Sequence, residues 1–259
     1  MYCKHFETFV NNCILEKQFV GTGNPNCDIL FVGKESAINQ NNIIAMNWYL
    51  SNAKEWRTRI LNNTLDTYEY LVDENHSLRK NWGKNTWSKY QKLTDEIYQR
   101  KPQPYYVNFL KNVFTTEMND SPSEKTALAN KDSINNRKLL FENSSFIQNF
   151  KVVVLACSDY FTNNDSIREI DKTFGVSYIG DEIGKYYYSK GNWFFIHKNL
   201  AESKIVIHTR QLSANVNNQL LKDMGKVFKG TKWKPDDYRD LLCLLFELIR
   251  LARANPVGL

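Results

Sequence analysis

The stretch Cys27–Val32 (CDILFV) is a short apolar run rich in β-branched and aromatic residues. Three further runs of this kind follow along the chain, at Tyr105–Leu110 (YYVNFL), Lys151–Ala156 (KVVVLA) and Lys204–Ile207 (KIVI). Three of the four are nearly continuous rather than alternating, which is typical of strands buried on both faces of a parallel sheet. Together they predict a central, mainly parallel four-stranded sheet.

The segments between these runs carry helical patterns. Lys84–Arg100 places aromatic and aliphatic residues at helical spacing and stops at a Lys-Pro pair, and Asn130–Phe150 is a weaker helical stretch. Tyr186–Ile196 is predicted to form a β-hairpin around a turn that contains glycine. Because strands and helices alternate, we predict an α/β fold with three α/β/α layers.

The chain organisation is predicted to be one domain over residues 1–259. A largely helical insertion is expected at about 43–85, and a C-terminal helix at about 235–254. That last helix has Pro235 in its first turn, a wide leucine-rich face, and Arg250 and Arg253 near its end. We expect the apolar face to pack on the sheet.

Composition excludes several classes of protein. The 259 residues are 42% hydrophobic and 24% charged, and no apolar run approaches the roughly 20 residues of a membrane helix. We therefore expect no membrane partner and a cytoplasmic location. The five cysteines are scattered, with no CxxC pair, which argues against a disulfide framework, a zinc site or an iron–sulfur cluster. We expect neither metal nor cofactor.

Polar residues follow the predicted strands at the edge where parallel sheets bind ligands. Gly33 and Glu35 follow the first strand, and Asn108 lies within the second. Ser158 follows the third strand and His208 follows the fourth. A carboxylate, an amide and an imidazole on one edge predict an acid–base site with a hydrogen-bonding group that reads the substrate.

These motifs resemble those of the uracil-DNA glycosylase superfamily in order and approximate spacing. Val32–Ser36 (VGKES) is similar to its first loop, Tyr105–Lys111 (YYVNFLK) to its second strand, and His208–Ser213 (HTRQLS) to its last loop. Glu35 stands where that family usually has Asp or Asn, and the last loop lacks the Pro-Ser pair. The cysteines that hold a cluster in some branches have no counterparts, so the resemblance is to a branch without an iron–sulfur cluster.

The resemblance implies a DNA base-excision N-glycosylase that flips out and hydrolyses a deaminated or modified, uracil-like base. Glu35 would orient or deprotonate water, or stabilise positive charge on the sugar. His208 would hydrogen-bond the departing base as negative charge develops on it.

The resemblance also implies roles in substrate binding. Asn108 would read the Watson–Crick edge of the base, and Trp48 would stack on it. Gly33 and Ser158 would line the same pocket.

DNA is the partner that the resemblance implies, and the net charge of +6 is compatible with it. Lys34, Lys111 and Arg210 would contact phosphates, and Leu212 would insert into the vacated base stack.

Other readings stay open at this point. Glu35 is alternatively a solvated residue of a first helical turn, Asn108 a buried amide, His208 a structural histidine and Trp48 a core residue. The same fold is also compatible with a non-catalytic nucleic-acid-binding protein, or with a nucleoside hydrolase that acts on a small molecule.

Overall fold

The computed structural model describes residues 1–64, 68–213 and 215–229. The α-helices are α1 (Lys4–Leu15), α2 (Ile43–Asn62), α3 (Thr86–Tyr98), α4 (Ile134–Asn143), α5 (Ser145–Gln148), α6 (Glu169–Phe174), α7 (Asp181–Gly184) and α8 (Asn218–Lys229). The strands are β1 (Thr22–Gly23), β2 (Ile29–Gly33), β3 (Tyr70–Leu71), β4 (Tyr106–Val107), β5 (Val113–Glu117), β6 (Val152–Leu155), β7 (Ser177–Tyr178), β8 (Lys185–Ser189), β9 (Asn192–Lys198) and β10 (Ile205–Thr209). Three 3-10 helices are η1 (Phe109–Lys111), η2 (Thr126–Leu128) and η3 (Ser158–Tyr160).

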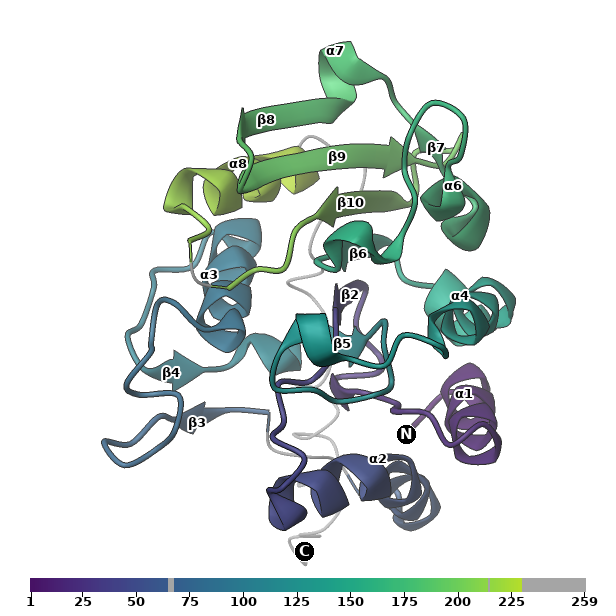
Figure 1. Cartoon of the computed structure of the whole chain (residues 1–259), viewed down its shortest axis with the longest axis vertical. Coiled ribbons are helices and arrows are strands. Elements are labelled where there is room, and N and C mark those ends of the chain that lie inside the picture. The colour runs from purple at the N-terminus through teal and green to yellow at the C-terminus, as the bar shows by residue number, and fades with distance from the viewer. Residues whose placement is uncertain (65–67, 214, 230–259) are drawn as a thin grey trace, which may run out of the picture.

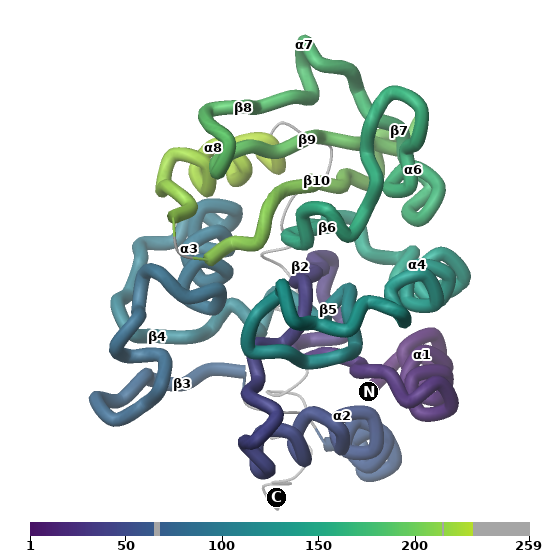
Figure 2. Tube along the Cα trace, viewed as in Figure 1, coloured from purple at the N-terminus to yellow at the C-terminus, as the bar shows by residue number. Residues whose placement is uncertain are grey.

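The main sheet is mixed, with a parallel centre. Its strand order is β1-β5-β2-β6-β10-β9-β7, and β8 pairs with β9. The pairs β5·β2, β2·β6 and β6·β10 are parallel, whereas the flanking strands pair antiparallel. Figure 2 shows β10 lying between β9 and β6, although β6 comes about 50 residues earlier in the chain. The predicted α/β class and mainly parallel central sheet are confirmed, but the sheet has eight strands rather than four.

Helices cover both faces of the sheet because the central strands are apolar on both sides. In β2, Leu30 and Val32 face the core cluster that contains residues of α1, α2, α4 and α5. Ile29 and Phe31, which alternate with them, face the cluster that contains residues of α3 and α8. Figure 1 shows α3 and α8 on one side of the sheet and α1, α4 and α6 on the other.

The second predicted strand, Tyr105–Leu110, is wrong for the main sheet. Only Tyr106–Val107 of this run is extended, and it pairs with β3 in a separate two-stranded sheet. Phe109 and Leu110 continue as η1 and are buried beside α3. In the main sheet β2 lies between β6 and β5, so the strand that follows this run is β5 and Asn108 lies in the connection before it.

The predicted hairpin and two of the predicted helical segments are confirmed. The hairpin at Tyr186–Ile196 is confirmed as β8 and β9, and the helices at Lys84–Arg100 and Asn130–Phe150 are confirmed as α3 and as α4 with α5. The stretch at about 43–85 begins with α2, which contacts α1 through a ring pair between Trp56 and Phe6 at 5.0 Å. The predicted helix at about 235–254 lies outside the described residues.

Candidate functional site

A pocket of about 340 Å³ lies at the carboxyl edge of the parallel sheet, the edge at which open α/β sheets bind ligands. The loop after β2, the end of β5 and the first turns of α3 form it, and α2 adds one tryptophan. We call it the carboxyl-edge pocket. Its lining includes Gly33, Lys34, Glu35, Trp48, Trp87, Tyr90, Glu117 and Gln211.

Glu117, the last residue of β5, reaches this pocket because Gly33 has no side chain. The two residues are register partners on adjacent parallel strands. A Cβ atom built on Gly33 would lie 2.1 Å from Oε2 of Glu117, far inside contact distance. The glycine therefore makes room for the carboxyl group.

Glu35 is held two residues beyond Gly33 and is only 5% exposed. The hydroxyl of Thr126 donates a hydrogen bond to its Oε1, and the hydroxyl of Tyr160 donates one to its Oε2. These donors come from η2 and η3, so segments distant in sequence fix the carboxylate. Hydroxyl donors to both oxygens stabilise a buried carboxylate.

The two carboxyl groups are coupled electrically. Burial and, to a smaller extent, the charge of Glu35 raise the pKa of Glu117 to about 8, although the guanidinium of Arg137 opposes both. Among the described residues, the Glu117 carboxyl has no hydrogen-bond or ion-pair partner. At neutral pH this raised pKa favours the protonated form of Glu117.

Arg137 donates hydrogen bonds to the last residues of β5, next to the Glu117 carboxyl. Its side chain is fully buried. It donates to the carbonyl of Glu117 at 3.1 Å, the carbonyl of Phe19 at 2.7 Å, the hydroxyl of Thr116 at 2.8 Å and the amide oxygen of Gln18 at 2.9 Å. Within the described part of the chain, no carboxylate forms an ion pair with it.

Aromatic rings form much of the remaining wall. Trp48 of α2, 48% exposed, approaches the ring of Phe19 with centroids 6.2 Å apart. Trp87 and Tyr90 of α3 also line the pocket, and both pack on Phe109. A planar ligand in this pocket would therefore meet ring faces and edges as well as carboxyl groups.

Four residues of the site predicted from sequence line the carboxyl-edge pocket: Gly33, Lys34, Glu35 and Trp48. The Lys34 ammonium forms an ion pair with Asp159 at 2.7 Å and lies over the ring of Tyr160. Lys34 thus fixes η3, which carries the tyrosine that donates to Glu35.

Asn108, Ser158 and His208 are not among the residues that line this pocket. The amide of Gln91 donates to Oδ1 of Asn108 at 2.8 Å. His208 is 4% exposed, and its Nε2–H donates to the carbonyl oxygen of Ser158 at 2.8 Å. The structure therefore does not bring the amide and the imidazole to the carboxylate, and their functional roles stay predictions.

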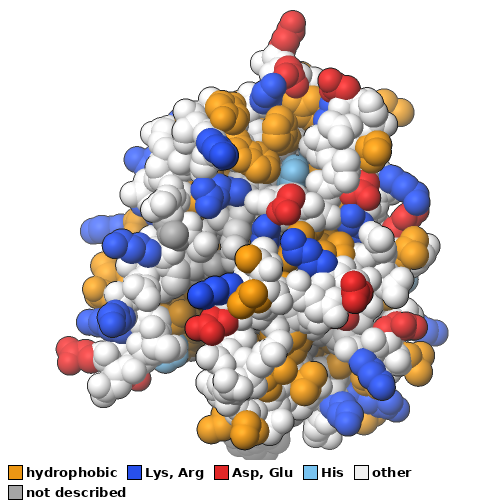
Figure 3. Space-filling view, viewed as in Figure 1, with side chains coloured by type: hydrophobic (Ala, Val, Ile, Leu, Met, Phe, Trp, Pro, Cys, Tyr) orange, Lys and Arg blue, Asp and Glu red, His pale blue; other side chains and the backbone are white. Residues whose placement is uncertain are grey.

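The residues assigned to DNA contact are engaged within the protein. Lys111 forms an ion pair with Glu69 at 2.7 Å, and Arg210 donates to the carbonyl of Gly191 at 3.1 Å. Leu212 is fully buried in the core beside α3 and α8, so it has no surface with which to enter a base stack. Figure 3 shows basic side chains interspersed with acidic ones on the face that it draws.

The stability of the fold is expected to fall in mild acid because of His208. Burial lowers the pKa of this histidine from 6.5 to about 4, and its Nδ1 has no partner among the described residues. The unfolded chain binds a proton below pH 6.5, whereas the folded chain resists it down to about pH 4, so stability is lost as pH falls through this window. We expect a loss of about 2 kcal/mol between pH 7 and pH 5.

Urea unfolding of the wild type and His208→Phe at several pH values measures this effect. The variant is expected to lose that part of the slope, and His5→Phe, at an exposed histidine, is the matched control. An unchanged slope in His208→Phe would show that His208 does not cause the dependence.

Glu117, Tyr160, Thr126 and Arg137 were missed by the sequence reasoning. Val113–Glu117 (VFTTE) does carry a strand signal, in its β-branched residues followed by a carboxylate. The hydroxyl partners and the buried arginine give no comparable local signal, because their roles depend on segments distant in sequence.

Over residues 1–64, 68–213 and 215–229, no helix combines the length and apolarity needed to cross a bilayer. In the same ranges, no three His, Cys, Asp or Glu side chains are grouped as a metal site would require.

The sequence matches a family model, motility protein A N-terminal, over residues 205–256. This is less than a quarter of the chain. The match begins at β10, includes α8 and continues beyond the described residues. No curated protein matches the chain.

This match overturns the resemblance to the uracil-DNA glycosylase superfamily, because it is to a motility family. The predictions of glycosylase activity, base flipping and a DNA partner are therefore wrong as well. The two alternatives, a nucleic-acid-binding protein and a nucleoside hydrolase, also find no support in the comparisons. The chain is therefore described as an α/β protein with partial similarity to the motility protein A N-terminal family.

Proposed function

We propose that the carboxyl-edge pocket binds a small planar organic cation and exchanges a proton as it does so. The observation that carries this proposal is the pair Glu35 and Glu117, in which Glu117 has a pKa of about 8 and no partner among the described residues. A pKa close to neutral is a property of groups that transfer protons at functional sites.

The chemistry of the pocket favours a cation with N–H groups. The charge on Glu35 attracts a cation, and the Glu117 carboxyl, which has no partner in the described ranges of the chain, accepts hydrogen bonds once it is deprotonated. Trp48, Trp87 and Tyr90 offer aromatic surface, on which planar cations bind favourably. The nearby ammonium of Lys34 is already paired with Asp159.

Binding of such a cation would be coupled to proton release. A positive charge beside Glu117 lowers the pKa of this carboxyl, so the proton leaves to the solvent as the cation enters. Affinity is therefore expected to increase as pH rises from 6 to 8, by up to about tenfold per pH unit. Above pH 8 the proton is already lost, and the dependence levels off.

Calorimetric titration with benzamidine, a planar aromatic amidinium, tests the proposal. We expect the dissociation constant to fall between pH 6 and pH 8, with release of about one proton measured from buffers of different ionisation enthalpy. Benzamide, a neutral molecule of the same shape, is expected to show no such dependence. Glu117→Gln should abolish the dependence, and Glu124→Gln, an exposed carboxylate, is the matched control. A pH-independent affinity, or equal binding of benzamidine and benzamide, would contradict the proposal.

The partial match favours a second candidate function, a role in motility. It covers β10 and α8 and lies outside the lining of the carboxyl-edge pocket except for Gln211. Disruption of the gene should reduce swimming in soft agar, and the intact gene should restore it. Complementation with the Glu117→Gln gene tests whether swimming depends on the carboxyl-edge pocket. Unchanged swimming after disruption would rule out motility.

Further predictions from sequence remain part of this proposal. We regard the sheet and its two helical layers as a three-layer α/β/α scaffold within one domain of 259 residues. A cytoplasmic location and independence from metals and cofactors are likewise proposed.

A further inference from the structure

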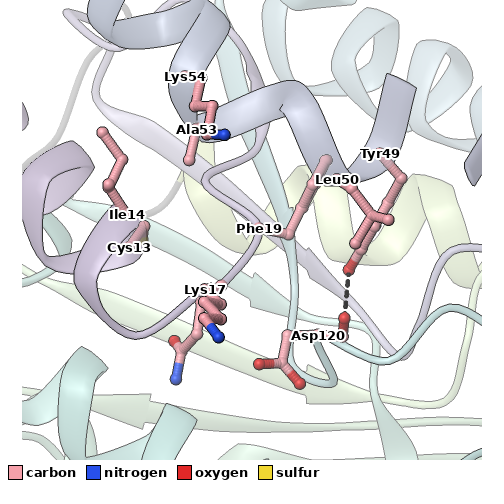
Figure 4. A pocket seen from close by; sticks show the side chains of 10 residues that line it. Cys13, Ile14, Lys17, Phe19, Tyr49, Leu50, Ala53, Lys54 and Asp120 are labelled. Carbon is pink, nitrogen blue, oxygen red and sulfur yellow. Dashed lines mark hydrogen bonds between the residues drawn. The ribbon is translucent and has the colours of Figure 1, made fainter. Parts of the chain in front are cut away.

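A second pocket, of about 340 Å³, lies between the end of α1 and the middle of α2. We call it the α1–α2 pocket; Figure 4 shows the side chains that line it. Its polar lining residues are Lys17, Gln18, Lys54 and Asp120, and the rest of its lining is mainly apolar. Neither glutamate of the carboxyl-edge pocket belongs to it.

Two stacked rings form one wall of the α1–α2 pocket. Phe19 and Tyr49 lie 4.5 Å apart with their planes within 4° of parallel, and both are buried. The Tyr49 hydroxyl donates to the backbone oxygen of Asp120 at 3.1 Å, so the polar end of this ring is already satisfied. Leu50 of α2 lines the same pocket and is 65% exposed. An apolar group in the pocket would cover this leucine and contact the rings.

The charged groups around this apolar wall give it a positive balance. Lys17, just after α1, and Lys54 of α2 both line this pocket, and within the described part of the chain neither forms an ion pair with a carboxylate. Asp120 accepts a hydrogen bond from the Ser133 hydroxyl, so part of its carboxylate is engaged. An anionic group is therefore favoured at the rim of this pocket over a cation.

The backbone at Lys17 supports a role for its side chain. The N–H of Gln18 donates to the carbonyl of Cys13 at 2.8 Å, and the N–H of Lys17 donates to the carbonyl of Ile14 at 3.3 Å. This is a Schellman arrangement, in which Lys17, with φ of 55°, occupies the position that favours glycine. A lysine at this position makes the fold less stable than a glycine would, and its side chain lines the pocket.

We propose that the α1–α2 pocket binds a small amphipathic carboxylate. The apolar body of the ligand would lie on the rings of Phe19 and Tyr49 and cover Leu50, and its carboxylate would pair with Lys17 or Lys54. A volume of about 340 Å³ is within the range of small-molecule sites and suits a chain of about eight carbons.

Octanoate is the probe for this proposal, and octanol and octylamine carry the same chain with no charge or the opposite charge. Calorimetric titration at low salt is expected to show that octanoate binds at least about fivefold more tightly than either. Lys17→Gly should weaken octanoate about fivefold while it raises the Tm by about 2 °C, because glycine fits the backbone at this position. The rise in Tm separates lost binding from lost folding.

The double variant Lys17→Gly/Lys54→Gln is expected to weaken octanoate about tenfold or more. Lys4→Gln, an exposed lysine at the start of α1, is the matched control and should change nothing. Glu117→Gln should also leave octanoate binding unchanged, which keeps this site distinct from the carboxyl-edge pocket. Equal affinity for octanoate and octanol, or an unchanged octanoate affinity in the double variant, would overturn the proposal.

Discussion

Arg137→Met is expected to lower the free energy of unfolding by about 4 kcal/mol, the largest effect of any substitution considered. Methionine fills much of the space of the arginine stem but donates no hydrogen bonds. Four acceptors, on Gln18, Phe19, Thr116 and Glu117, would lose their donor in a buried environment. Each such buried acceptor costs about 1–3 kcal/mol when it is left without a partner.

The same substitution is expected to raise the pKa of Glu117 further. Arg137 is the group that lowers this pKa against burial and the charge of Glu35. Without the guanidinium, the protonated form of Glu117 would persist to higher pH. If Arg137 acted only through its hydrogen bonds, its replacement would leave the pKa of Glu117 unchanged.

Urea unfolding at pH 7 measures the loss of stability in Arg137→Met. Lys138→Met is the matched control: Lys138 lies on the same helix as Arg137 and forms an ion pair with Glu169 of α6, whose side chain is 31% exposed, and its loss should cost about 1 kcal/mol. A loss in Arg137→Met no larger than in this control would show that the buried hydrogen bonds contribute little.

Glu117→Gln is expected to stabilise the protein in alkaline solution by about 3 kcal/mol and to change its stability little at pH 4.5. In the folded protein the pKa of Glu117 is raised from 4.5 to about 8. Between pH 4.5 and pH 8 the unfolded chain loses this proton while the folded chain keeps it, so stability is lost as pH rises across this window. Glutamine keeps the shape of the protonated carboxyl and cannot ionise.

Unfolding of the wild type and Glu117→Gln between pH 4.5 and pH 9 measures this difference. We expect a gap that widens between pH 4.5 and pH 8 and then stays constant. Because the Glu117 side chain is only partly buried, solvent screening reduces the expected difference in the free energy of unfolding to about 3 kcal/mol. Glu124→Gln should show no widening gap. Equal stability of wild type and Glu117→Gln at pH 9 would contradict the raised pKa.

The apolar runs predicted the central strands of the sheet correctly wherever the buried run is also a strand. Cys27–Val32, Lys151–Ala156 and Lys204–Ile207 became β2, β6 and β10 because strands covered by helices on both faces are continuously apolar. Tyr105–Leu110 failed because its apolar residues are buried beside α3 without joining the main sheet. An apolar run therefore indicates burial more securely than it indicates a strand in the sheet.

The site was predicted only on its β2 side. Gly33 and Glu35 followed from the position of β2, whereas Glu117 was missed because Thr115 and Thr116 interrupt the apolar pattern of β5. Arg137 was missed because arginine is ordinarily exposed, and only the carbonyls of two distant segments explain its burial. Such features depend on tertiary contacts that no single segment encodes.

The ionisation of Glu117 is the central claim, and ¹³C NMR titration of its side-chain carboxyl measures it most directly. Comparison with the spectrum of Glu117→Gln assigns the resonance. We predict a pKa of about 8 in the wild type, with a clear decrease in Glu35→Gln because the neighbouring charge is removed. A wild-type pKa near 4.5, or one that Glu35→Gln leaves unchanged, would contradict the coupled carboxyl pair on which the proposed function rests.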